Sequence, residues 1–284
     1  MEMFDATVEG KLKALYVLGE DPFLTLPNLD RVKNGIHQLE FLVVQDQFMT
    51  LVGNAAHVVL PGVSFAEKDG TFTSMGRRVQ RVRQAIAPLG DSRPDWKILC
   101  DLSAEMGYPM TYSGPAEVME EIASLVPLYS GMTYPRLEGD GIQWSLKSDG
   151  KRKFFPVDYR EPVERPEEAY PLWILPGGFH YHYGIGTTTK RAEGLARIYP
   201  DTCIQVHPED AAKAGVKDGD PVRVVSRRGS VETVCRISGA LPKGTAYVAS
   251  TFYNAPVNGL LISGYDPVSR TPEYKVVAGR VEKR

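Results

Sequence analysis

The stretch of this chain best equipped for chemistry is residues 173–191, which concentrates glycines, histidines, tyrosines and hydroxyls before a basic pair. It begins as an apolar strand and breaks at Pro176-Gly177-Gly178, where the backbone needs unusual dihedral angles. Glycines let a backbone approach a ligand closely, while threonine hydroxyls, backbone amides and Lys190-Arg191 suit phosphate. His180 and His182 add a local concentration of imidazoles. We interpret the stretch as a ligand-binding loop; the alternative is an ordinary surface loop whose aromatic residues cover a barrel end.

Polar pairs follow two apolar strands in the first half of the chain, at Glu20-Asp21 and at Gln45-Asp46. Ligands of parallel sheets bind beyond the carboxyl ends of the strands. A carboxylate there accepts hydrogen bonds from an amine or a ring N–H, and the N1–H and 2-amino group of guanine are suitable donors. The alternative is purely local, with Asp21 opening a turn at Pro22 and Asp46 capping the next helix.

The elements that would position these residues alternate between strand and helix. Short apolar runs at residues 12–18, 41–44 and 57–60 predict buried strands. Between them, Asn28 is the predicted N-cap of a helix that carries an apolar stripe through residue 39, and a short helix is predicted around residues 50–56. Strands this apolar, separated by helices, predict a parallel sheet covered on both faces.

Residues 64–125 combine a basic run with two helices. Four arginines lie within residues 77–83 and alternate with Val79 and Val82, which permits a strand whose basic face meets an anionic cofactor or a partner chain; a solvated face is the alternative. One helix is predicted from Pro94 to Met106 and another over residues 116–125. The inward face predicted for the first helix consists of Trp96, Leu99, Cys100 and either Leu102 or Ser103.

The last third of the chain is rich in strands. Apolar runs at residues 172–175, 203–206, 221–226, 231–237 and 245–248 are separated by tight turns, which predicts a small closed barrel. Residues 127–170 are rich in proline and glycine and have little periodicity, so they read as a connector with one hairpin near Gln143-Trp144 and Phe154-Phe155.

Composition excludes several classes of protein. Among 284 residues, 43% are hydrophobic and 24% are charged, and the formal net charge of −2 gives no reason to expect nucleic-acid binding or an anionic membrane partner. No apolar run approaches the ~20 residues that span a bilayer, and the N-terminus lacks a hydrophobic signal region. Three isolated cysteines without metal-site spacing suit a reducing compartment. We therefore expect a cytoplasmic protein.

Ordered blocks across nearly the whole chain resemble the C-terminal half of the catalytic subunit of molybdenum- or tungsten-dependent formate dehydrogenases, in the dimethyl sulfoxide reductase (molybdopterin oxidoreductase) family. The first block is Gly19-Glu20-Asp21-Pro22 with Val43-Val44-Gln45-Asp46, continuing through residues 67–73. The second is Pro94-Asp95-Trp96 with residues 105–110, which favour formate as the substrate. The third comprises the His182 loop, residues 207–211, 226–229 and 266–275.

The resemblance implies an α/β fold in two pieces. Residues 1–130 would be the C-terminal part of a doubly wound, Rossmann-like domain, residues 131–170 a connector, and residues 171–284 a double-psi β-barrel that binds a molybdopterin dinucleotide. The cofactor would be bis(molybdopterin guanine dinucleotide) carrying Mo or W. By position within matching blocks, the residues implied to hold one guanine nucleotide and its phosphates are Glu20, Asp21, Gln45, Asp46, Lys68 and Asp95. Those implied to hold the pterins and the second nucleotide are Gly178, His182, Tyr183, Gly186, Thr187, Thr188, Asn258 and Lys275.

Two departures accompany the resemblance. Relatives often have arginine at the position of Gly178, and His180 has no counterpart. In the family, the metal is ligated by Cys, selenocysteine or Ser from the N-terminal half, which also carries a four-cysteine iron–sulfur motif; neither is present here. The resemblance therefore implies no catalytic residue and no metal ligand in this chain.

We expect an obligate complex with a chain that carries the N-terminal half, together with iron–sulfur electron-transfer subunits. The expected function is clamping of the cofactor for two-electron formate/CO2 chemistry. The alternatives are another member of the family, such as a nitrate reductase or a formylmethanofuran dehydrogenase, a non-catalytic scaffold like the related subunit of respiratory complex I, or an excised domain of a longer enzyme.

Overall fold

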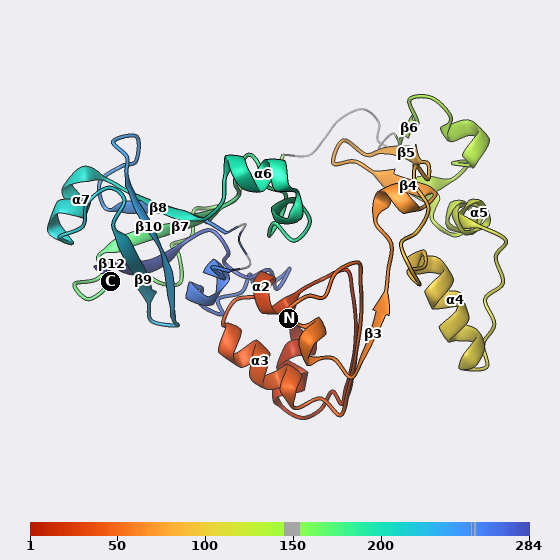
Figure 1. Cartoon of the computed structure of the whole chain (residues 1–284), viewed down its shortest axis with the longest axis horizontal. Coiled ribbons are helices and arrows are strands. Elements are labelled where there is room, and N and C mark those ends of the chain that lie inside the picture. The colour runs from red at the N-terminus through yellow and green to blue at the C-terminus, as the bar shows by residue number, and fades with distance from the viewer. Residues whose placement is uncertain (145–153, 251, 253) are drawn as a thin grey trace. The chain divides into compact units, whose positions relative to one another are not determined.

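The structure is a computed structural model that describes residues 1–144, 154–250, 252 and 254–284. The chain forms two compact units, and neither is continuous in sequence. The first consists of Met1–Leu15, Glu20–Leu42 and Tyr159–Arg284, and the second of Tyr16–Gly19 and Val43–Asp158. Figure 1 colours these segments along the chain. The hairpin expected near Gln143-Trp144 and Phe154-Phe155 is wrong for the residues described: Gln143 pairs with Arg78, whereas Phe154 and Phe155 are exposed and belong to no strand. Residues 145–153 lie outside the described part.

The first unit contains a closed barrel of six strands, as the turn-rich sequence predicts (Figure 1). The strand order is β10-β8-β11-β7-β12-β9. Two neighbouring pairs, β8 with β10 and β7 with β11, are parallel, and the other four are antiparallel. The strands are β7 (Leu172–Gly177), β8 (Cys203–Val206), β9 (Pro221–Ser226), β10 (Ser230–Ile237), β11 (Thr245–Ala249) and β12 (Val277–Lys283).

Alternation along each strand fills the barrel interior. In β9, Val222 and Val224 are fully buried whereas Arg223 points to solvent, because successive side chains of a strand leave opposite faces. In β12, Gly279 lies between β7 and β9, and a Cβ there would come within 2.7 Å of Ile174 Cγ1 and 2.9 Å of the Val225 carbonyl oxygen. Gly279 therefore permits a closer strand approach than any side chain would allow.

The first unit also contains short helices. They are α1 (Glu2–Val8), α2 (Pro22–Thr25), α3 (Leu29–His37), η5 (Thr189–Arg191), α6 (Glu193–Ile198), α7 (Pro208–Lys213) and η6 (Val257–Leu260). Among them, α3 contacts α1, α2 and η6. The predicted apolar stripe of α3 is confirmed, since Leu29, Val32 and Ile36 are buried. Its predicted N-cap is wrong in role: Asn28 has φ +55° and makes no cap bond, and its amide donates to Ser263 instead.

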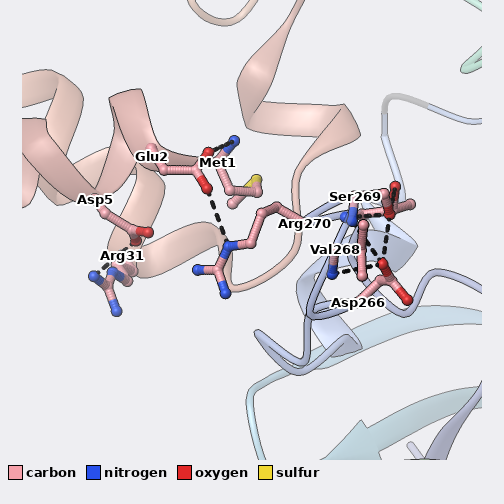
Figure 2. Close-up of polar contacts among 9 residues, drawn as sticks. Met1, Glu2, Asp5, Arg31, Asp266, Val268, Ser269 and Arg270 are labelled. Atoms are coloured by element: carbon pink, nitrogen blue, oxygen red, sulfur yellow. Dashed lines mark hydrogen bonds and ion pairs between the residues drawn. The ribbon is translucent and has the colours of Figure 1, made fainter.

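Ion pairs tie α1 to the loop that leads into Lys275 (Figure 2). Arg270 donates to Glu2 at 3.0 Å, while Arg31 of α3 contacts Asp5 at 2.9 Å. Within the loop, the Asp266 carboxylate accepts from the backbone amides of Val268 and Ser269. Because the partners of Asp266 are two and three residues further along, the loop conformation is defined locally.

The second unit contains most of two small sheets, although residues 14–15 and 41–42, which begin two of the strands, are assigned to the first unit. One has the order β1-β2-β3, with β2 and β3 parallel as predicted, and the other is an antiparallel sheet of order β4-β5-β6. The strands are β1 (Ala14–Leu18), β2 (Phe41–Asp46), β3 (Val58–Pro61), β4 (Gly70–Thr73), β5 (Arg78–Val82) and β6 (Ile142–Gln143). The helices are η1 (Gly53–Ala55), η2 (Phe65–Glu67), α4 (Asp95–Glu105), α5 (Pro115–Leu125), η3 (Pro127–Tyr129) and η4 (Tyr134–Leu137).

Two expectations for the second unit need correction. In α4, Ile98 and Cys100 are buried whereas Leu99 and Leu102 are exposed, because apolar residues surround this helix and no single stripe is marked. The basic run does not present a bare cationic face. Arg81 contacts Glu138 at 3.0 Å and Asp69 at 3.3 Å and stacks on the Tyr134 ring at 3.6 Å.

All three cysteines are free and buried, as expected of small hydrophobic side chains. Burial raises the pKa of the Cys235 thiol to about 11, with nearby Asp218 and Asp220 adding to the effect. The neutral thiol is therefore the form that the fold favours. No cluster of three or more metal-ligating side chains exists among residues 1–144, 154–250, 252 and 254–284, nor do these residues include a helix of the length and apolarity that membrane crossing requires.

The raised pKa of Cys235 predicts both a reactivity and a pH dependence. In the folded chain, Cys235 should resist iodoacetamide at pH 8.5 and should react fully in guanidinium, as measured by peptide mass spectrometry. Its contribution to the free energy of unfolding is present below the ordinary thiol pKa of about 8.5 and is lost as pH rises to about 11. Cys235→Ala should remove that part of the alkaline loss of stability. Alkylation of native Cys235 at the denatured rate would contradict this expectation.

Candidate cofactor-binding site

Three of the residues singled out by resemblance meet in one polar network of the second unit. Gln45 Nε2 donates to Asp95 Oδ1 at 2.8 Å, and Lys68 Nζ donates to Asp95 Oδ2 at 2.6 Å. Gln45 is fully buried, whereas the side chains of Lys68 and Asp95 keep 27% and 31% of their exposure. One carboxylate therefore joins a buried amide to a partly exposed ammonium group.

The backbone explains how residues 50 positions apart come together. Gln45 lies near the carboxyl end of β2, and Asp95 is the first residue of α4, where the helix dipole favours a negative charge. The chain reaches α4 through Arg93, whose amide donates to the Pro61 carbonyl at the end of β3. Gly62 makes room, since a Cβ there would lie 3.0 Å from Asp95 Oδ1. Gln45 and Asp46 thus form the last two residues of β2 itself, and the expectation that a ligand binds at this end of the strand stays a prediction.

A cavity of about 220 Å³ opens beside the network. Lys68, Asp69 and Asp95 contribute its charged groups. Its apolar walls come from α4, α5 and η4, through Trp96, Pro115, Val118, Met119, Ile122 and Tyr134. An apolar slot with a carboxylate and an ammonium group at its edge can hold a flat heterocycle whose N–H groups donate to Asp95, with an anionic substituent at Lys68.

Sequence reasoning missed Tyr16, the fourth member of the network. Its hydroxyl donates to Gln45 Oε1, a contact that joins neighbouring strands β1 and β2. Burial raises the pKa of Tyr16, and the charge of Asp95 raises it further, so the phenol stays protonated and remains a donor. In sequence, Tyr16 stands within an apolar run, where an aromatic residue indicates only a buried strand.

Asp46 and Asp21 both have local partners, but only Asp21 takes the role held open as the alternative, since the next helix after Asp46 has Val52 as its N-cap. Asp46 accepts from the Phe48 amide at 3.1 Å, which forms a turn. In the first unit, Asp21 is the N-cap of α2 and accepts from the Phe23 amide at 3.1 Å. Glu20 accepts from the Thr25 hydroxyl. These bonds give each carboxylate a role in chain folding beside any role toward a ligand.

Asn258 contacts the C-terminal end of α2, the short helix whose N-cap is Asp21. Its amide nitrogen donates to the carbonyl oxygens of Leu24 and Thr25 at 3.0 and 2.8 Å. Since the last carbonyls of a helix lack intrahelical donors, Asn258 satisfies them from η6, over 230 residues later. The first unit thus brings Asn258 to the Glu20–Asp21 segment.

His182 is buried within the loop it was expected to serve. Its Nδ1 lies 3.1 Å from Thr189 Oγ1, its Nε2 lies 3.1 Å from the Tyr199 carbonyl oxygen, and its ring meets Phe252 edge-on. A carbonyl can only accept, so Nε2 carries the hydrogen. Both ring nitrogens are thus engaged within the chain, and the imidazole fixes the loop conformation.

The other cofactor-binding residues predicted in this loop are exposed, take part through backbone carbonyls, or are glycines. Tyr183 is exposed, and Gly186 has φ +77°, a conformation that favours glycine. The carbonyls of Thr187 and Gly178 accept from Arg191 and Tyr247, while Thr188 precedes η5. A Cβ at Gly178 would meet nothing within 4 Å, so space exists where relatives were expected to carry arginine.

Lys275 is exposed and has no hydrogen-bond or ion-pair partner among the described residues. It follows Tyr274, whose pKa is raised by burial and by the charge of Glu20. An unpaired ammonium group on a defined loop remains available for an anion.

Comparisons with known proteins cover both units. Residues 1–105 match the family model described as molybdopterin oxidoreductase, and residues 172–278 match the model described as molybdopterin dinucleotide binding domain. The chain is 38% identical to the F420-dependent formate dehydrogenase 2 subunit alpha of Methanococcus maripaludis, over 96% of this chain and 43% of that protein. It is 36% identical to the F420-dependent formate dehydrogenase subunit alpha of Methanocaldococcus jannaschii, over 99% of this chain and 45% of that protein.

The fold itself is shared with a solved structure. Acetylene hydratase from Pelobacter acetylenicus superposes with a TM-score of 0.82 at 19% identity, over 99% of this chain and 46% of that one. The chain thus spans less than half the length of these relatives. Its two matched segments, and relatives that cover almost all of it, agree on one conclusion: the chain is similar to molybdopterin oxidoreductases, and within them to the C-terminal part of formate dehydrogenase alpha subunits.

Proposed function

We propose that this chain is the cofactor-clamping, C-terminal part of the catalytic subunit of a molybdenum- or tungsten-dependent formate dehydrogenase. The observation that carries the proposal is the network of Gln45, Asp95 and Lys68 beside a cavity, in a chain similar over nearly its whole length to formate dehydrogenase alpha subunits. The complete enzyme would interconvert formate and CO2 by a two-electron reaction.

The residues present fit bis(molybdopterin guanine dinucleotide). Asp95 can accept from the N1–H and 2-amino groups of a guanine, and Lys68 stands beside it to meet phosphate oxygens. On the first unit, the open space at Gly178, the turn at Gly186 and the unpaired Lys275 suit a second nucleotide and the pterins. The metal and pterins supply the redox chemistry when bound, and this chain supplies position and charge.

The other proposed site residues divide into two roles. Gln45 would orient Asp95, and His182 would hold the loop that presents Tyr183, Thr187 and Thr188. Lining of the nucleotide sites is proposed for Glu20, Asp21 and Asp46, which are anchored by local bonds, and for Asn258, which is anchored by bonds to the carbonyls of Leu24 and Thr25.

We assign the metal ligand and an iron–sulfur cluster to the polypeptide that carries the remaining, N-terminal part of the subunit, whether that part is a separate chain or continuous with this one. Further iron–sulfur subunits would carry electrons away, and the assembly would be cytoplasmic. The domain limits expected from the sequence, 1–130, 131–170 and 171–284, belong to the same proposal, and the two matched segments support them.

The test is analysis of the purified native complex. We expect Mo or W, a fluorescent oxidised pterin, GMP released by acid hydrolysis, and formate-dependent reduction of a viologen dye. Coenzyme F420 should be tried as a second acceptor because two relatives are named F420-dependent. Pterin and metal without formate oxidation would point to another reaction of the family, and a complex without pterin would refute the proposal.

A further inference from the structure

A series of hydrogen bonds joins four side chains and ends at the Asp95 carboxylate; the other three are Tyr16, Gln45 and Lys68. The Tyr16 hydroxyl donates to Gln45 Oε1, Gln45 Nε2 donates to Asp95 Oδ1, and Lys68 donates to Asp95 Oδ2. The amide can satisfy both neighbours in only one orientation, because its oxygen must face the phenol and its nitrogen the carboxylate.

Two of these four side chains reach the cavity. Lys68 and Asp95 line it, whereas Tyr16 and Gln45 do not. Gln45 is fully buried, so its amide has no water to replace a lost partner. Tyr16 is consequently placed to act on a ligand without touching it.

We propose that Tyr16 is a positioning residue for base recognition: by fixing the Gln45 amide it holds the Asp95 carboxylate in one direction, as the acceptor for the 2-amino group of a guanine. This inference rests on the proposed function, since it concerns the nucleotide site of the same cofactor. It adds a specificity element on β1 that no ligand contact would identify.

Removal of the phenolic oxygen has a specific consequence. Without the Tyr16 hydroxyl, the buried Gln45 Oε1 has lost its hydrogen-bond donor. The Gln45 side chain then rotates, and this rotation breaks the hydrogen bond from Nε2 to Asp95. The Asp95 carboxylate is then held only by its bond from Lys68 and can rotate. Its attraction for a phosphate-bearing ligand changes little, but its alignment with the 2-amino group is lost.

The test compares GDP with IDP, which lacks the 2-amino group, by calorimetric titration of the full chain. We expect wild type to prefer GDP by roughly tenfold or more, since hydrogen bonds to charged groups have effects of this size. Tyr16→Phe should reduce the preference to roughly threefold or less, mainly by weakening GDP binding. Tyr108→Phe, at an exposed tyrosine of the same unit, should keep the wild-type preference.

The outcomes separate the two proposals. Equal weakening of GDP and IDP in Tyr16→Phe, or an unchanged preference, would show a merely structural tyrosine and overturn this inference alone. Failure of wild type to bind GDP more tightly than ADP would overturn the proposed nucleotide site, and this inference with it. If Tyr16→Phe fails to fold in a thermal melt, Gln45→Met, which removes the whole amide, should show the same lost preference; retention of the preference would overturn the inference.

Discussion

Asp95→Ala should lower the affinity of the chain for GDP by roughly 10- to 100-fold. Hydrogen bonds to charged groups contribute about 1.5–3 kcal/mol, and each 1.4 kcal/mol is a factor of about ten in Kd. The substitution removes the acceptor offered to the base and also leaves Gln45 Nε2 and Lys68 Nζ without their partner. Calorimetric titration of GDP into the full chain measures the effect directly.

A matched carboxylate lies on the same helix. Asp101 contacts Lys97 and Arg93, does not line the cavity, and is not joined to Gln45. Asp101→Ala should therefore bind GDP as wild type does. Equal affinities in the two variants would show that Asp95 takes no part in binding. In the assembled enzyme, the same comparison should appear as lost GMP and pterin content in Asp95→Ala alone.

Gly279→Ala should destabilise the barrel by about 1–3 kcal/mol, the range for overpacked cores. The added methyl group would lie 2.7 Å from Ile174 Cγ1 and 2.9 Å from the Val225 carbonyl oxygen. Relief requires the Ile174 side chain to shift and β12 to move away from β9, because the obstacle at Val225 is backbone. The expected loss of thermal stability is about 2–4 °C for each kcal/mol in a domain of 150–250 residues, as measured by differential scanning calorimetry.

Gly239→Ala is the control for this variant. Gly239 lies in the connection between β10 and β11, and a Cβ there would meet no atom within 4 Å. Its melting temperature should stay within a degree or so of wild type, since surface substitutions usually change stability by less than ~0.5 kcal/mol. Identical melting of the two variants would mean that the strands beside Gly279 can separate freely.

Short apolar runs separated by tight turns predicted the barrel strands well, and the structure shows why the runs contain polar residues: inward-facing Val222 and Val224 alternate with solvent-facing Arg223. The predicted parallel pairing of β2 and β3 is likewise confirmed. The inward face predicted for α4 was right at Cys100 but wrong at Leu99 and missed Ile98, because apolar residues occupy several faces of this helix and periodicity alone could not choose among them. No pattern predicts that residues 20–42 join residues 159–284 in one unit, since the contact of Asn258 with Leu24 spans the chain.

The candidate site was predicted by resemblance more than by spacing. In the sequence, Lys68 and Asp95 are ordinary charged residues. Only the contact between them in the structure indicates a shared site. Tyr16 could not be found, because its hydroxyl finds its partner 29 residues later across a strand pair. Asp21 shows the opposite case, in which a short-range alternative read from the sequence is realised, whereas Asp46 forms a turn with Phe48 in place of the helix cap that the sequence suggested.

The barrel also constrains how the protein is made. β12 closes it by pairing with both β7 and β9, yet β12 is the last of the six strands in the sequence. While a ribosome is still translating residues 277–283, β7 and β9 must wait with free edges. Contacts between distant residues slow folding, and open edges invite pairing with other chains. The nascent polypeptide is therefore exposed to aggregation through these strand edges until β12 is added. A chaperone or early insertion of the cofactor would shorten that period.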